Sequence, residues 1–108
     1  MGQLVLGALL VKQGKIDEAL VALKRAVTLD PKEFEAHWAV GRALALQEHY
    51  PEAVASFQQA VALAPERSDA HYQLGLALRR LGRTEEANRE FAIVERLNAE
   101  FRTSTNPK

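Results

Sequence analysis

Three histidines, His37, His49 and His71, are the side chains of this 108-residue chain best suited to acid–base or metal chemistry. His37 and His71 stand 34 positions apart (71 minus 37) in the matching segments EAHWAVG and DAHYQLG. If these segments form neighbouring parallel helices, the two rings lie about 10 Å apart, too far to share a zinc ion with bonds of about 2.1 Å. We therefore interpret both histidines as residues that pack between helices, and we expect no metal site.

No other constellation of residues points to catalysis. The chain contains no cysteine, which excludes disulfides, thiolate metal sites and a thiol nucleophile. The HExxH, glycine-rich phosphate-loop and GxSxG motifs are absent. Carboxylates lie in the expected turns and in the first turns of the expected helices, where the helix dipole stabilises negative charge. We expect a protein that is not an enzyme and that binds no cofactor.

Charge and hydropathy narrow the classes of partner. Lys and Arg number 14, Asp and Glu number 14, and the sequence pI is about 6.8, whereas nucleic-acid and anionic-membrane binders need a basic surplus. The longest apolar run, Leu4 to Val11, is too short to span a bilayer and lacks the flanks of a signal peptide. We expect a soluble protein, with the cytoplasm slightly favoured, that neither binds nucleic acid nor inserts into a membrane.

The elements that would position any functional side chain follow a period of 34 residues. Residues 34–67 superpose on both flanking segments without an insertion, which is typical of stacked repeat proteins. The matching positions hold Gly7, Gly41 and Gly75; Ala19, Ala53 and Ala87; Leu23, Phe57 and Phe91; and Pro31 and Pro65. Apolar and small residues recur at spacings of three and four in two segments of each period. The pattern predicts six helices, at about 2–13, 16–29, 33–47, 51–63, 67–81 and 84–101.

Small residues should let the two helices of each repeat approach closely. In the middle repeat, Gly41 on the first helix and Ala53 and Ala60 on the second provide short side chains, and Phe57 fills the space beside them. We predict that these four residues lie in the core.

These positions resemble the tetratricopeptide repeat (TPR) family, whose 34-residue helix–turn–helix pattern contains Leu-Gly, alanine, phenylalanine and proline. The Leu-Gly pair is matched by Leu6-Gly7, Val40-Gly41 and Leu74-Gly75. The chain departs from the pattern at the usual tryptophan, where it has Gln3, His37 and His71, and at the usual tyrosine, where it has Leu10, Leu44 and Leu78. The resemblance covers essentially the whole chain.

The resemblance implies an all-α fold, a right-handed α-solenoid of three stacked helix–turn–helix hairpins with six helices. We expect one TPR domain over residues 1–102, with repeats at about 1–33, 34–67 and 68–101. Residues 103–108 should form a frayed C-terminal tail.

The resemblance also implies a concave groove that holds a peptide or a helix of a partner protein. On the first helix of each repeat, a stripe of residues at spacings of three and four lies beside the packed face. The stripe comprises Leu4, Ala8 and Val11; Glu35, Trp38, Arg42 and Ala45; and Asp69, Tyr72, Leu76 and Arg79. This predicted stripe would be acidic at one rim, aromatic in the middle and basic at the other rim, with an apolar floor from the first repeat. Exposed aromatic residues and arginines commonly anchor interfaces.

A purely structural interpretation of the same residues stays open. Glu35 and Asp69 suit helix N-termini, where the dipole favours carboxylates. Trp38 and Tyr72 could pack between adjacent repeats, and the arginines of the stripe could simply be exposed to solvent.

One TPR subtype is not expected. Some family members clamp the C-terminal carboxylate of a chaperone with lysine, asparagine and arginine along this stripe. The equivalent places here hold Leu4, Ala8, Ala39 and Asp69, so the lysines and asparagines are missing.

The two ends of the array differ in polarity. The last predicted helix has Asn88 and Glu95 where the earlier second helices have Leu20 and Val27, or Val54 and Val61, so we expect no further repeat after it. The first predicted helix is apolar nearly all round, and such a helix is normally buried. Its apolar residues are Leu4, Val5, Leu6, Leu9, Leu10 and Val11.

Three functions therefore stay open. The first is a scaffold that binds a protein or peptide in the groove, and the second is homo-oligomerisation through the N-terminal helix. In the third, the chain is the C-terminal piece of a longer TPR protein or of a multidomain enzyme.

Overall fold

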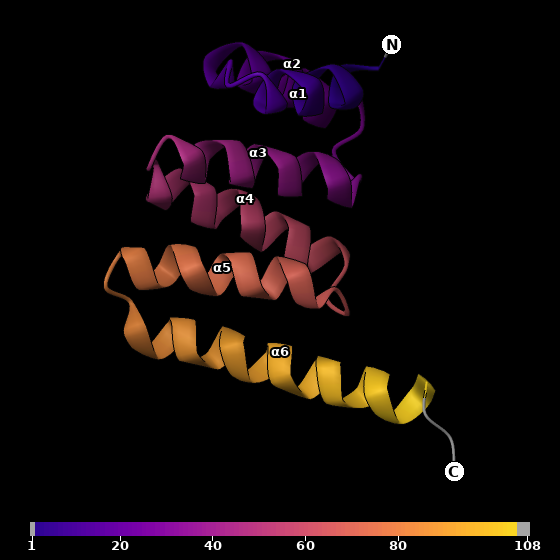
Figure 1. Cartoon of the computed structure of the whole chain (residues 1–108), viewed down its shortest axis with the longest axis vertical. Helices are drawn as coiled ribbons and strands as arrows, with labels where there is room; N and C mark the ends of the chain where they lie inside the picture. The colour runs from indigo at the N-terminus through magenta and orange to yellow at the C-terminus, as the bar shows by residue number, and fades with distance from the viewer. Residues whose placement is uncertain (1, 106–108) are drawn as a thin grey trace.

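Six α-helices, with no strand, make up the part of the chain that the computed structural model describes, residues 2–105, with side chains through residue 103. They are α1 (Gln3–Lys12), α2 (Ile16–Leu29), α3 (Phe34–Leu46), α4 (Tyr50–Leu63), α5 (Ser68–Arg80) and α6 (Thr84–Thr105). Successive helices pair into three antiparallel hairpins stacked in chain order, and the termini lie at opposite ends of the stack (Figure 1). The predicted all-α solenoid of hairpins is confirmed. None of the described helices is both long and apolar enough to cross a bilayer.

A glycine facing a large apolar side chain sets the spacing of each hairpin. A Cβ atom added to Gly41 would lie 2.7 Å from the ring of Phe57, and one added to Gly7 would lie 2.4 Å from Leu23. Gly75 stands in the same relation to Phe91, at 2.6 Å. Real Cβ atoms do not approach so closely, so only glycine lets the two helices of a hairpin pack at this distance.

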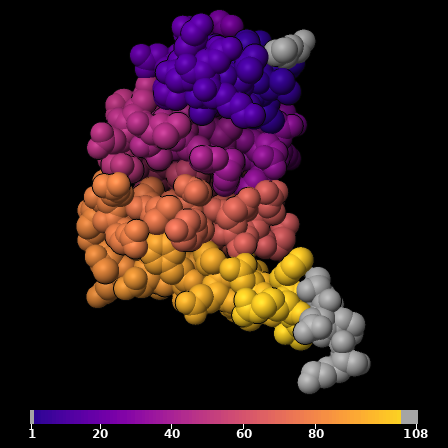
Figure 2. Space-filling model, in the orientation of Figure 1, coloured from indigo at the N-terminus to yellow at the C-terminus, as the bar shows by residue number. Residues whose placement is uncertain are grey.

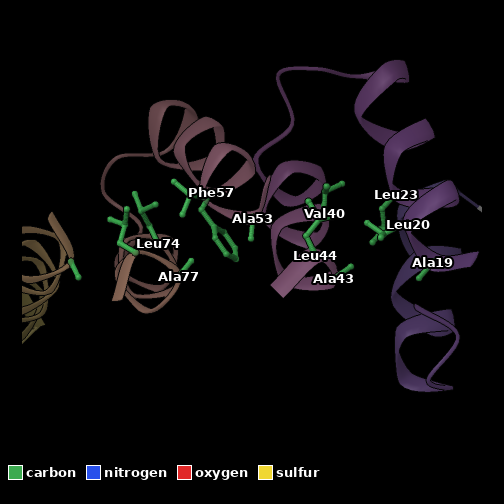
Figure 3. Close-up of a cluster of buried hydrophobic side chains, with 13 residues drawn as sticks. Ala19, Leu20, Leu23, Val40, Ala43, Leu44, Ala53, Phe57, Leu74 and Ala77 are labelled. Carbon is green, nitrogen blue, oxygen red and sulfur yellow. The ribbon is translucent and has the colours of Figure 1, made fainter. Parts of the chain in front are cut away.

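The core runs as a row across the stack instead of forming one central cluster (Figure 3). It passes from Leu20 and Leu23 of α2, through Val40 and Leu44 of α3, to Phe57 of α4 and Leu74 of α5. Phe57 and Leu23 are the largest fully buried side chains among the described residues. The predicted core residues Ala53, Phe57 and Ala60 are 0% exposed, and Gly41 is buried.

Equivalent turns within the three hairpins require a left-handed backbone residue. Gly14 and Gly82 occupy this position with φ of 77° and 78°. The middle repeat has Glu48 at the same register, with φ of 62°. A side chain with a Cβ atom is strained in this conformation by roughly 1–2 kcal/mol, which glycine avoids.

The last helix is longer than we predicted. We expected a helix to about residue 101 and a frayed tail from Thr103, but α6 continues to Thr105 and projects beyond the stack (Figure 2). No glycine or proline occurs in residues 84–105, so the sequence contains no stop signal there. The remainder of the predicted tail, residues 106–108, lies outside the described residues, and the domain limits stay a prediction.

Substituting alanine for Gly41 should lower the free energy of unfolding by about 1–3 kcal/mol through overpacking, partly offset by the higher helix propensity of alanine. The reason is that the ring of Phe57 is 0% exposed and has no room to move. Urea unfolding followed by circular dichroism measures the change. Gly75→Ala is the matched control, because Phe91 is only half-buried and can turn aside. Equal losses at the two positions would contradict this account.

Substituting glycine for Glu48 should raise the free energy of unfolding by up to about 1 kcal/mol, because it removes the left-handed strain. The same urea titration measures the gain. Glu48→Ala is the control, since alanine removes the carboxylate and keeps the Cβ atom. A glycine variant no more stable than the alanine variant shows that no strain is stored in this turn.

Candidate functional site

Two of the three histidines hold the starts of the second and third hairpins against the preceding loops. The Nε2 atom of His37 donates to the carbonyl oxygen of Pro31 at 2.7 Å, and that of His71 donates to the carbonyl oxygen of Pro65 at 2.8 Å. The Nδ1 atom of His71, which is 4% exposed, also lies 2.7 Å from a carboxylate oxygen of Glu90. In residues 2–103, no three or more His, Asp or Glu side chains gather as they would around a metal ion.

A first hollow lies between α1 and α3. Four residues of the predicted stripe, Ala8, Val11, Trp38 and Arg42, line it together with Lys12 and Leu46. A second hollow lies between α3 and α5. Its lining includes Arg42, Ala45, Leu76 and Arg79 of the predicted stripe, with Leu46 and Arg80.

A third hollow extends the same surface over α5 and α6. Tyr72, Leu76 and Arg79 of the predicted stripe line it with Phe91, Val94 and the carboxylate residue Glu95. Each hollow shares lining residues with the next, so the three make one surface that crosses the stack from α1 to α6. We call this surface the trough.

Three arginines of the trough rest on aromatic rings. The guanidinium carbon of Arg42 lies 4.9 Å from the ring centroid of Trp38. The corresponding distances are 5.6 Å from Arg79 to Phe91 and 5.7 Å from Arg80 to Tyr50. Within the described residues, none of these three arginines forms an ion pair with a carboxylate. Their charges are therefore held in place by stacking and are not neutralised.

Glu35 and Asp69 lie near the helix starts and do not line the three hollows. Arg67, at the start of α5, binds both: its Nη1 atom is 3.4 Å from Glu35 and its Nη2 atom is 2.9 Å from Asp69. The hydrogen bond to Asp69 is the largest effect that raises the pKa of Arg67 above its ordinary value. The acidic rim that we predicted is thus partly neutralised by an arginine that sequence analysis did not single out.

Three members of the predicted stripe differ in how deeply they are buried. Leu4 packs against the core cluster and lines none of the three hollows, and its expected place on the groove floor stays a prediction. Trp38 also packs against the core, and its buried indole nitrogen has no hydrogen-bond partner among the described residues. Tyr72 is 46% exposed. Trp38 therefore serves packing as well as the trough wall, whereas Tyr72 is mainly surface.

Sequence reasoning missed a second register of trough residues. Lys12, Leu46 and Arg80 occupy one repeat position, each 34 residues from the next (46 minus 12, 80 minus 46), and all three line hollows. They directly follow Val11, Ala45 and Arg79 of the predicted stripe. The repeat period carried the signal, because a helical face is wider than a single line of residues at spacings of three and four.

Comparison with protein families gives consistent matches along the chain. A family model described as TPR repeat matches residues 7–48 and again residues 41–82. A second model, described as Tetratricopeptide repeat, matches residues 69–97. A search of the curated proteins gave no match.

Several solved structures are similar over most of this chain. The second TPR of Spaghetti (RPAP3), solved with the HSP90 peptide SRMEEVD, shares 26% identity and a TM-score of 0.85, with 88% of each chain covered. A crystal structure of MamA shares 28% identity and a TM-score of 0.87, covering 92% of this chain and 58% of MamA. YrrB, described as a TPR protein with an unusual peptide-binding site, shares 28% identity and a TM-score of 0.83, over 88% of this chain and 49% of its own. The chain thus spans little more than half the length of MamA and about half that of YrrB.

Proposed function

This chain belongs to the tetratricopeptide repeat family, a protein-interaction fold, and on that premise we propose that it is a non-catalytic scaffold that binds a peptide or a helix of a partner protein in the trough. Two similar structures support the proposal by analogy. One was solved with a bound peptide, and the other is described as having a peptide-binding site.

The observation that carries the proposal is the combination of unpaired arginines and exposed apolar surface along the trough. Arg42 and Arg79 make no ion pair among the described residues, and Tyr72 is 46% exposed. Leu46 is 56% exposed beside them. Aromatic residues and arginines supply most of the strong contacts in protein interfaces, and unpaired surface arginines are free to bind a partner.

We assign direct contact with the partner to Arg42, Tyr72, Leu76 and Arg79, which line the second and third hollows. Ala8, Val11 and Trp38 form the apolar end of the same surface, between α1 and α3. Glu35 and Asp69, held by Arg67, border the trough near the helix starts.

A second candidate function is self-association through the open face of α1. Val5 is 58% exposed and Leu9 is 42% exposed. The repeat equivalents of Leu9 are Ala43 and Ala77, which are 0% and 2% exposed because a preceding hairpin packs against them. A second copy of this chain that covered α1 would bury the corresponding face of the first hairpin.

Selection of a random peptide library tests the groove proposal. The double variant Arg42→Ala, Tyr72→Ala should bind the enriched peptides at least about tenfold more weakly than the unmodified chain, as expected for interface anchors. Fluorescence anisotropy with labelled peptides measures the affinities, and circular dichroism checks that helicity is unchanged. We avoid Trp38 because it also packs against the core.

The control for this experiment is the pair Val21→Ala, Lys24→Ala, which lies in a separate hollow along α2 and α4. This pair should bind the peptides as the unmodified chain does. If the two double variants lose affinity equally, or if no peptide is enriched, the trough is not the binding surface.

Sedimentation velocity over a range of concentrations tests self-association. The variant Val5→Lys, Leu9→Glu should stay monomeric where the unmodified chain oligomerises, because it places charges in an apolar contact. Leu63→Lys, at an exposed leucine of α4, is the control and should leave the oligomer intact. An unmodified chain that is monomeric at every concentration rules out this function.

A further inference from the structure

We propose that the partner segment bound in the trough is acidic, with carboxylates that pair with Arg42, Arg79 and Arg80 on either side of an apolar side chain seated between α3 and α5. The inference rests on the proposed function, to which it adds the chemistry of the partner. It concerns the second hollow, where these three arginines meet.

Charge is unevenly distributed over the surface of this molecule. The chain as a whole is neutral, with 14 basic and 14 acidic residues. Among the described residues, the lining of the second hollow nevertheless includes three arginines and no carboxylate. A neutral molecule that gathers cations without counterions at one hollow presents a local positive potential there, and this potential favours an anionic partner.

The helix dipole accounts for two of these three charges and leaves the third unexplained. Arg79 and Arg80 lie in the last turn of α5, where cations stabilise the helix dipole. Arg42 lies in the interior of α3, whose last turn contains no basic residue, so the dipole does not account for it. Its side chain is exposed and stacks on Trp38.

The same molecule contains a stacked arginine that does bind carboxylates. Arg67 also rests on an aromatic ring, with its guanidinium carbon 4.4 Å from the ring centroid of Phe34. This stacked arginine binds two carboxylates, those of Glu35 and Asp69. Stacking occupies the face of a guanidinium and leaves the N–H groups at its edge free to donate to carboxylates. Arg42, Arg79 and Arg80 are stacked in the same way, and none of them binds a carboxylate of the described residues.

Apolar side chains lie among the three arginines in the second hollow. Ala45, Leu46, Leu76 and Tyr50 give the second hollow an apolar floor, and Leu46 is 56% exposed. A partner that offered only carboxylates to the arginines would leave this apolar surface exposed to water. An aliphatic or aromatic side chain between them would cover it and gain the free energy of apolar burial.

An acidic protein segment fits this surface better than a nucleic acid does. Nucleic-acid binding draws on many phosphate contacts and a basic surplus, whereas the net charge of this chain is zero. The arginines cluster around one hollow with an apolar floor, a geometry that accommodates a side chain.

The test uses a random 12-residue peptide library selected on the unmodified chain. Affinities of the enriched peptides are then measured for the charge variant Arg42→Gln, Arg79→Gln, Arg80→Gln. Its matched control is Lys24→Gln, Arg25→Gln, Arg89→Gln, which removes the same charge from exposed positions on α2 and α6. Tyr72→Ala reports whether a peptide lies in the trough at all. A 12-nucleotide single-stranded DNA serves as the alternative anionic probe.

We expect the enriched peptides to have a surplus of Asp and Glu around an apolar residue. The charge variant should bind them at least about tenfold more weakly, and the control should stay within about twofold. Affinity should also fall when NaCl is raised from about 50 mM to about 300 mM, because salt screens the pairs.

Four results would overturn the inference. In the first, Tyr72→Ala weakens peptide binding and the charge variant does not. The trough then binds peptides without recognising their acidic residues, and the proposed function stands. Equal losses in the charge variant and its control show unspecific attraction. DNA that binds as tightly as the peptides, with the same dependence on the three arginines, shows a general anion site. Peptides that are insensitive to Tyr72→Ala and to the charge variant remove the proposed function as well.

Discussion

The close contact between a glycine and a large apolar side chain is the constraint on which the rest of this structure depends. It occurs once in each hairpin, at Gly7 with Leu23, Gly41 with Phe57 and Gly75 with Phe91. Because the two helices of every hairpin approach to a similar depth, the hairpins stack in register and their first helices lie side by side. The trough lies mainly on the surface that these first helices share, so the spacing of its arginines depends on the close contact within each hairpin.

Most of the fold could be predicted from the sequence because one strong signal, the 34-residue period, fixes helix number, hairpin pairing and core positions together. The end of α6 could not, since the expected stop rested on the repeat pattern and the local sequence contains no glycine or proline to enforce it. The stripe residues came from helical spacing alone. That reasoning reached Arg42, Leu76 and Arg79 but missed Arg80 and Leu46, which lie one position further round the helix.

Contacts between different helices were the least predictable part of the candidate site. Arg67 binds Glu35 across a separation of 32 residues, and His71 meets Glu90 across a separation of 19. Neither pair recurs at the repeat period, because the preceding repeat has Glu33 at the position of Arg67 (67 minus 34) and Ser56 at the position of Glu90 (90 minus 34). Such pairs distinguish one repeat from the next, and they depend on side-chain geometry that a periodic pattern does not specify. The stacking of Arg79 on Phe91 and of Arg80 on Tyr50 also depends on side-chain geometry that the repeat pattern does not specify.

The row-like core has a consequence for cooperativity. In the described residues, the first and third hairpins share no contact, and each is joined only to the middle one. A stack held by nearest-neighbour interfaces opens from its ends, because a terminal unit loses one interface where the central unit loses two. A ligand lying along the trough would span α1, α3 and α5 and so link the two outer hairpins. Occupancy would then convert three units that open separately into one that opens as a whole.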